Sequence, residues 1–117
     1  MMVDLVRLVN EGQGEVLRPV LLSIVEGSRL DMLKAIEVGA ITHPKGSVDV
    51  QYSMIAKDYM SVAQANAKNT RGLFQYALAL AASKKSHMSS CREMCIASLK
   101  SYFSKLPKNV SDYILSL

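Results

Sequence analysis

The sequence predicts an all-α protein, a compact antiparallel bundle of about six helices formed by one domain over residues 1–117. Half of the residues are hydrophobic and 21% are charged, which is typical of a chain with a packed core. Aromatic residues make up only 6% and Trp is absent, which favours helices over a β-sandwich. Short breaks separate the apolar segments, and no internal repeat or linker divides the chain, so we expect neighbouring helices in one bundle.

Glycine and proline divide the first predicted helices. An apolar segment that begins at Val3 predicts a short helix ending near Gly12. The second helix is expected to start at Pro19, because the missing N–H of proline has no partner in a first turn, and to end at Gly27 as a C-cap. Residues 20–25 between them are apolar nearly all round, which predicts a central helix enclosed by the others.

A capping box is predicted at the start of the third helix. Ser28 is followed three residues later by Asp31, whose carboxylate would reach back to the cap N–H, and the helix would end at Gly39. Residues 48–52 alternate as in a strand and also fit a helical spacing. The helical pattern is the longer one, so it predicts a helix over residues 48–67.

The remaining apolar segments predict the helices of the second half. Residues 73–82 are rich in Ala and Leu, follow a polar break that ends at Thr70, and form with residues 20–25 the segments expected to be most buried. Ser90 is expected to open the next helix, and Asn109 opens a short final helix.

His87, Cys91 and Cys95 are spaced by four residues and share one helical face. The helical rise spreads the three side chains over about 12 Å, too far for one zinc ion with bonds near 2 Å. Both cysteines lie on the apolar stripe of their helix and are expected to be buried. No glycine-rich phosphate loop, nucleophile elbow or clustered carboxylates accompany them. We therefore expect no metal, no cofactor and no catalytic residue, and the protein is not predicted to be an enzyme.

The longest apolar segments indicate a chain without a membrane span. They fall short of the roughly 20 residues that cross a bilayer. Asp4 and Arg7 would interrupt the apolar core of a secretory signal, and two cysteines give no disulfide scaffold. The expected location is intracellular, in the cytoplasm or the nucleus.

Positive charge is concentrated in the second half of the chain. Residues 1–58 hold six Lys or Arg against eight Asp or Glu, a net charge of −2, whereas residues 59–117 hold eight against two, a net charge of +6. Such asymmetry is typical of proteins with an anionic partner. The first prediction is therefore a non-catalytic RNA- or DNA-binding protein that also self-associates. Its candidate phosphate-binding residues are Lys68, Arg71, Lys84, Lys85, Arg92, Lys100, Lys105 and Lys108.

Methionine supports an alternative function. Seven methionines occur in 117 residues, and their flexible side chains suit an apolar groove that binds a partner helix or a second copy of the chain. The two predictions differ in where the cations lie. Convergence of the eight cations on one surface would favour nucleic acid, and scattered cations beside an apolar groove would favour a protein partner.

Overall fold

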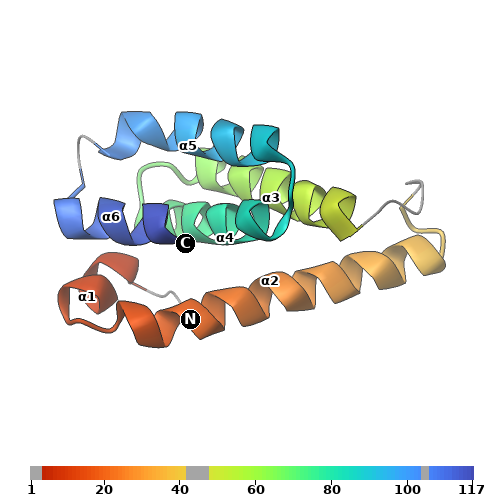
Figure 1. The fold of residues 1–117 in the computed structure, drawn as a ribbon, viewed down its shortest axis with the longest axis horizontal. Helices are drawn as coiled ribbons and strands as arrows, with labels where there is room; N and C mark the ends of the chain where they lie inside the picture. Colours follow the sequence, from red (N-terminus) through yellow and green to blue (C-terminus); the bar gives the residue numbers. More distant parts are fainter. Residues whose placement is uncertain (1–3, 42–47, 104–105) are drawn as a thin grey trace.

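The computed structural model describes residues 4–41, 48–103 and 106–117, without the side chains of 70 and 101–103. Over these residues the chain forms six helices and no strand, which confirms the predicted all-α bundle (Figure 1). The helices are α1 (Leu5–Asn10), α2 (Gly14–Glu37), α3 (Val48–Ala65), α4 (Thr70–Lys85), α5 (Ser89–Phe103) and α6 (Lys108–Ser116). None of these helices has the length and apolar character that crossing a bilayer requires.

α4 is the central helix of the bundle, since it contacts each of the other five. Residues 76–83 are buried on every side of the helix. Leu78 and Leu80 alternate there with alanines, whose small side chains let the neighbouring helices approach closely. The prediction that residues 73–82 form a most buried segment is therefore confirmed, with Phe74 and Gln75 half-buried.

α2 corrects the prediction of two separate helices, because it is continuous through Gly27. Ser28 is no cap: its hydroxyl donates to the carbonyl of Ile24 one turn earlier, at 3.0 Å. The predicted capping box of Ser28 and Asp31 is therefore wrong. A glycine inside a helix costs about 1 kcal/mol, and burial of Leu21 and other side chains along the same helix face offsets that cost.

Pro19 lies inside α2 and not at its first turn, since the helix already begins at Gly14. Proline lacks the N–H that would donate to the carbonyl four residues earlier in the helix. Because Pro19 is exposed, that carbonyl can bind water instead.

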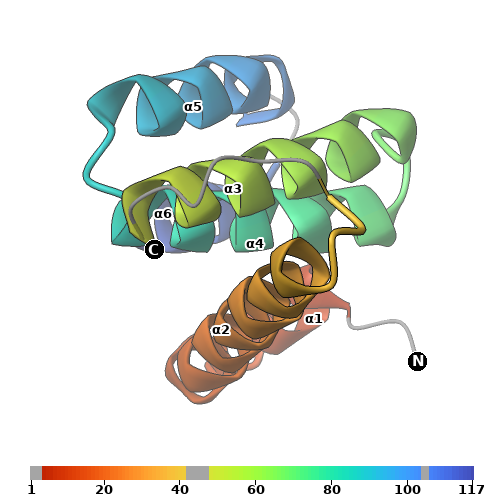
Figure 2. The same cartoon turned by 90° about the vertical axis from the view of Figure 1, so that its right-hand side faces the viewer.

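The predicted burial of residues 20–25 is also wrong for part of the segment. Val20, Leu22 and Ile24 are 48%, 36% and 36% exposed, whereas Leu21 and Val25 are fully buried. The cause lies in the packing: Figure 2 shows α2 lying beside the group of α3, α4, α5 and α6, so only one side of the helix is covered.

Most predicted helix ends agree with the structure within one or two residues. Gly12 and Gly39 both adopt φ of +75°, the left-handed conformation that ends a helix, which confirms the expected breaks there. Residues 48–52 are helical, as predicted. α5 begins one residue before Ser90, and α6 begins one residue before Asn109.

Gly72 gives a test of the packing between α3 and α4. A Cβ on Gly72 would overlap the backbone carbonyl group of Asn66, closer than two atoms can approach. We expect Gly72→Ala to lower the free energy of unfolding by about 1–3 kcal/mol, measured by urea denaturation. Gly27→Ala is the control: no atom lies within 4 Å of the added Cβ, so the better helix former should raise stability by about 0.5–1 kcal/mol. Equal losses in both variants would contradict this account.

Candidate protein-interaction groove

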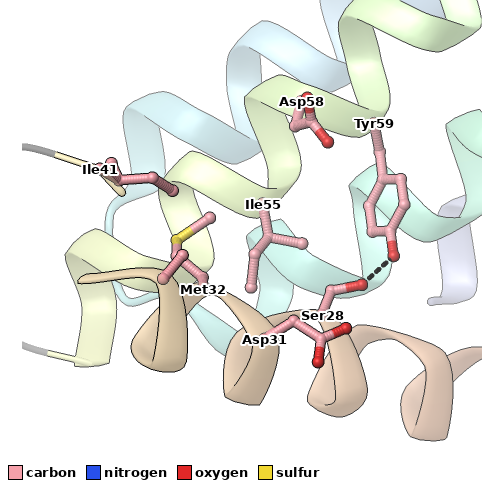
Figure 3. A pocket seen from close by; sticks show the side chains of 8 residues that line it. Ser28, Asp31, Met32, Ile41, Ile55, Asp58 and Tyr59 are labelled. Atoms are coloured by element: carbon pink, nitrogen blue, oxygen red, sulfur yellow. Dashed lines mark hydrogen bonds between the residues drawn. The ribbon is translucent and has the colours of Figure 1, made fainter. Parts of the chain in front are cut away.

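A groove runs between the C-terminal half of α2 and α3 (Figure 3). It consists of two adjoining hollows with volumes of about 310 Å³ and 500 Å³, which share Met32, Ile41 and Asp58 in their walls. The residues that line the two hollows are Ser28, Asp31, Met32, Ala35, Ile41, Met54, Ile55, Lys57, Asp58, Tyr59 and Ser61. We call this surface the α2–α3 groove.

The floor of the α2–α3 groove is apolar. Met32 from α2 and Ile55 from α3 face each other across it, and Ile41 lies at one end (Figure 3). Met32 and Met54 are half-buried, so their thioethers line the groove without being locked into the core. An unbranched methionine adapts its shape to a bound apolar side chain at little cost.

Two carboxylates stand on opposite walls of the groove, Asp31 on α2 and Asp58 on α3 (Figure 3). Both are exposed. No described side chain forms an ion pair with either of them. Lys57 is the only cation among the lining residues, so the groove carries a net charge of −1.

Hydrogen bonds between α2 and α3 fix the separation of the two walls. The hydroxyls of Ser28 and Tyr59 are in contact at the groove, drawn as the dashed line in Figure 3. Farther along, the Tyr52 hydroxyl donates to Glu26 at 2.5 Å. Within α2, Arg29 donates to the other carboxylate oxygen of Glu26 at 2.7 Å. The two contacts between the helices, Ser28 with Tyr59 and Tyr52 with Glu26, give the groove a defined width before any partner binds.

The hydrogen bond from Arg29, followed by the one from Tyr52, lowers the pKa of Glu26 from 4.5 to about 2. Both donors favour the charged carboxylate, and they outweigh the opposing effect of burial. Glu26 therefore contributes stability as an anion and loses that contribution only in acid.

Two of the predicted phosphate-binding cations cap the end of α6. Lys84 donates to the carbonyl of Ser116 at 3.2 Å, and Arg92 donates to the carbonyl of Leu115 at 3.3 Å. Arg18 joins them, with a hydrogen bond of 3.1 Å to Ser116. Cations at a helix C-terminus satisfy carbonyls that have no partner within the helix. Arg18 lies in the acidic half of the chain, so charge counting did not identify it.

The other predicted cations lie elsewhere. Lys85 is 5.6 Å from the ring centre of Tyr52, a cation–π contact on the side of α3. Lys68, Arg71, Lys100 and Lys108 are exposed. Lys68 lies between α3 and α4, Arg71 and Lys108 lie in the first turns of α4 and α6, and Lys100 lies in the last turn of α5. The ends of α3 and α5 and the starts of α4 and α6 lie toward one end of the long axis (Figure 1). Lys105 lies outside the described residues. The seven described cations of the predicted set therefore divide among three places.

Cys91 and Cys95 are buried in the core, as predicted. The Cys95 thiol approaches the carbonyl of Ala79 at 3.9 Å, and burial raises its pKa to about 12. Only the thiolate is a nucleophile or metal ligand, so Cys95 is poorly suited to either role. His87 is exposed. Within the described ranges no three His, Cys, Asp or Glu side chains are grouped as for a metal ion.

Comparison with known proteins gives no match: no family model fits the chain, and no curated protein or solved structure is significantly similar to it.

The sequence does not reveal the acidic residues of the groove. Asp31 lies in the predicted capping box, and no sequence pattern relates it to Asp58. In the continuous helix α2, Ser28, Met32 and Ala35 share one face at positions i, i+4 and i+7. That pattern was the available signal for this wall.

Glu26→Gln tests the contact between the groove walls. Folding lowers the pKa of Glu26 from 4.5 to about 2. The charged Glu26 therefore stabilises the folded protein fully above pH 4.5, and this stabilisation disappears as the pH falls toward 2. At neutral pH we expect the variant to lose about 1 kcal/mol in urea denaturation, a modest value because the side chain is 39% exposed. The loss should shrink between pH 4.5 and pH 2.

Glu37→Gln is the matched control, since Glu37 ends the same helix and is exposed without a described ion pair. A loss for Glu26→Gln that stays constant down to pH 2 would contradict the role given to its charge.

Proposed function

We propose that the protein is a non-catalytic interaction module that binds an amphipathic helix of a protein partner in the α2–α3 groove. Apolar side chains of the partner would pack on Met32, Met54 and Ile41. Its basic side chains would pair with Asp31 and Asp58. The observation that carries the proposal is an apolar, Met-lined groove with an unpaired carboxylate on each wall.

The chemistry of the groove supports a helix as the ligand. Helix-in-groove recognition uses apolar anchors at i, i+3, i+4 and i+7, which need a long apolar floor and not an enclosed cavity. The two hollows adjoin along the α2–α3 boundary and supply such a floor. Carboxylates on both walls favour a partner with cations on both sides of its apolar stripe.

The distribution of cations supports the same proposal. Lys84 and Arg92 already bind carbonyls at the end of α6, and Lys85 stacks on Tyr52. A single cationic surface for nucleic acid is thus divided, whereas the groove residues come from two adjacent helices.

A designed helical peptide of leucine and lysine, with leucines at i, i+3, i+4 and i+7, is a direct probe of the groove. We expect it to bind at low salt and to shift the methyl NMR signals of Met32, Met54, Ile41 and Ile55. The matched probe replaces every lysine with glutamate and keeps the leucines. It should bind more weakly, because its charges meet those of Asp31 and Asp58.

Substitutions in the groove then distinguish specific binding in the groove from non-specific binding of the peptide elsewhere on the protein. The double variant Asp31→Asn and Asp58→Asn should weaken the lysine peptide by about threefold to tenfold, since each exposed ion pair is worth up to about 1 kcal/mol. Glu93→Gln, an exposed acid on α5, is the control and should change nothing. Equal affinity for both peptides, or shifts that avoid the groove methyls, would reject the proposal.

A second candidate function, binding of RNA or DNA, draws on one specific observation. Lys68, Arg71, Lys100 and Lys108 are exposed and have no described ion pair. Because the ends of α3 and α5 and the starts of α4 and α6 lie toward one end of the bundle, these four residues are placed to serve a common phosphate backbone (Figure 1).

Fluorescence anisotropy with labelled single- and double-stranded RNA and DNA at low salt tests this second function. The double variant Lys68→Gln and Arg71→Gln should weaken binding and reduce the salt slope by the amount expected for two phosphate contacts, about 1.8 on duplex DNA and about 1.4 on single strands. Lys34→Gln with Lys57→Gln removes the same charge from the other half and is the control. Lys84 is a poorer choice for substitution, because its loss would also disturb α6. Absence of binding at low salt would exclude the function.

A further inference from the structure

α2 has an outward face that no described residue covers. Val16, Val20 and Leu30 are 70%, 48% and 53% exposed on it. Along α2, residues 16, 20, 23, 27, 30 and 34 follow each other at alternating spacings of four and three. That alternation places side chains in one straight stripe along a helix, the spacing used in helix pairs. We call this stripe the outer face of α2.

The centre of the outer face is made of small residues. Ser23 and Gly27 are both exposed there, and no atom lies within 4 Å of a Cβ built on Gly27. Apolar side chains stand on either side, Val16 and Val20 toward one end and Leu30 toward the other. A second helix can therefore approach closely at the centre and pack on larger side chains at both ends.

We infer that a second copy of this chain binds the outer face, with the two α2 helices antiparallel. The stripe is complementary to itself when it is reversed about a point between Ser23 and Gly27. Ser23 then lies opposite Gly27 of the second copy, and Val20 lies opposite Leu30. Each of these contacts occurs twice in the symmetric pair.

Charge supports the same arrangement. Lys34 is exposed at one end of the stripe and has no described ion pair. Reversal brings it opposite Val16 of the second copy, and Glu15 of that copy lies on the flank of the stripe, about 100° around the helix from Val16. Glu15 is 83% exposed and makes only a 3.4 Å contact with Arg18. The pairing thus joins an unpaired cation to a weakly paired anion at both ends of the dimer.

The available area sets the strength of the dimer. A helix of 24 residues is about 36 Å long and about 10 Å wide, so two facing stripes cover about 700 Å² in total. Stable interfaces bury about 1,200–2,000 Å². An interface of this size predicts a weak dimer, which forms as the protein concentration rises. It does not depend on the α2–α3 groove, whose floor lies on another side of α2, with only the Asp31 wall bordering the outer face.

Sedimentation velocity over a range of concentrations is the first test. The chain should change from monomer to dimer as its concentration rises. Leu30→Glu should weaken the dimer at least tenfold by placing two carboxylates in the stripe. Val48→Glu is the matched control, since Val48 is also 53% exposed but belongs to α3. Gly27→Leu should also weaken the dimer while the monomer still folds, because open space surrounds this position.

Cysteine cross-linking tests the antiparallel register. Val20→Cys and Leu30→Cys should form no covalent dimer separately under mild oxidation, because each residue is about 15 Å from its own copy along the paired helices. A mixture of the two variants should form a disulfide-linked heterodimer. Cys91 and Cys95 are buried, so the unsubstituted chain gives the background.

Three results would overturn the inference. The first is a monomer at every accessible concentration. The second is equal weakening by Leu30→Glu and Val48→Glu. The third is efficient cross-linking of either cysteine variant alone, which would indicate a parallel pair. Loss of peptide binding in the α2–α3 groove would bear only on the proposed function.

Discussion

The burial of α4 is the constraint on which the rest of the structure depends. A helix that is apolar on every side must be covered on every side, and all five other helices contact it. Its alanines keep those neighbours close. Each outer helix then has one face on the core and one face away from it. Because α2 has 24 residues and α4 has 16, α2 extends past α4 along the long axis (Figure 1). The α2–α3 groove forms where α2 has α3 beside it.

The sequence predicts the burial of α4 correctly and that of α2 only in part, although both helices contain segments that are apolar nearly all round. Around Leu78 the pattern reflects a helix enclosed by others. Around Leu21 the same pattern belongs to a helix covered on one side, which leaves Val20 and Ile24 exposed. Periodicity shows which side chains are apolar, but the contacts that cover them are made between distant segments. The predicted helix end at Gly27 is wrong for a related reason. Glycine is a local signal for a helix end, but the packing of the residues around it against the core keeps α2 helical there.

The candidate site was less predictable than the fold. Composition correctly placed the positive charge in the second half, yet it could not show that Lys84 and Arg92 bind carbonyls at the end of α6. The groove depends on α2 and α3 lying side by side, so Asp31 and Asp58 had no visible relation in the sequence. Methionine was the one useful signal, since Met32 and Met54 both line the groove.

The two proposed surfaces of α2 are compatible with each other. Successive helical residues are about 100° apart, so Met32 on the groove floor lies roughly 160° around the helix from the centre of the outer face, whereas Asp31 on the groove wall lies roughly 60° from it. A dimer formed through the outer face therefore leaves the floor of both grooves open and borders their Asp31 walls. The antiparallel pair would present two copies of the same site, related by a two-fold axis. A partner with two basic helices could then bind both grooves at once, and its second helix would bind at a high effective concentration. Weak self-association and a shallow groove would together give stronger binding than either provides alone.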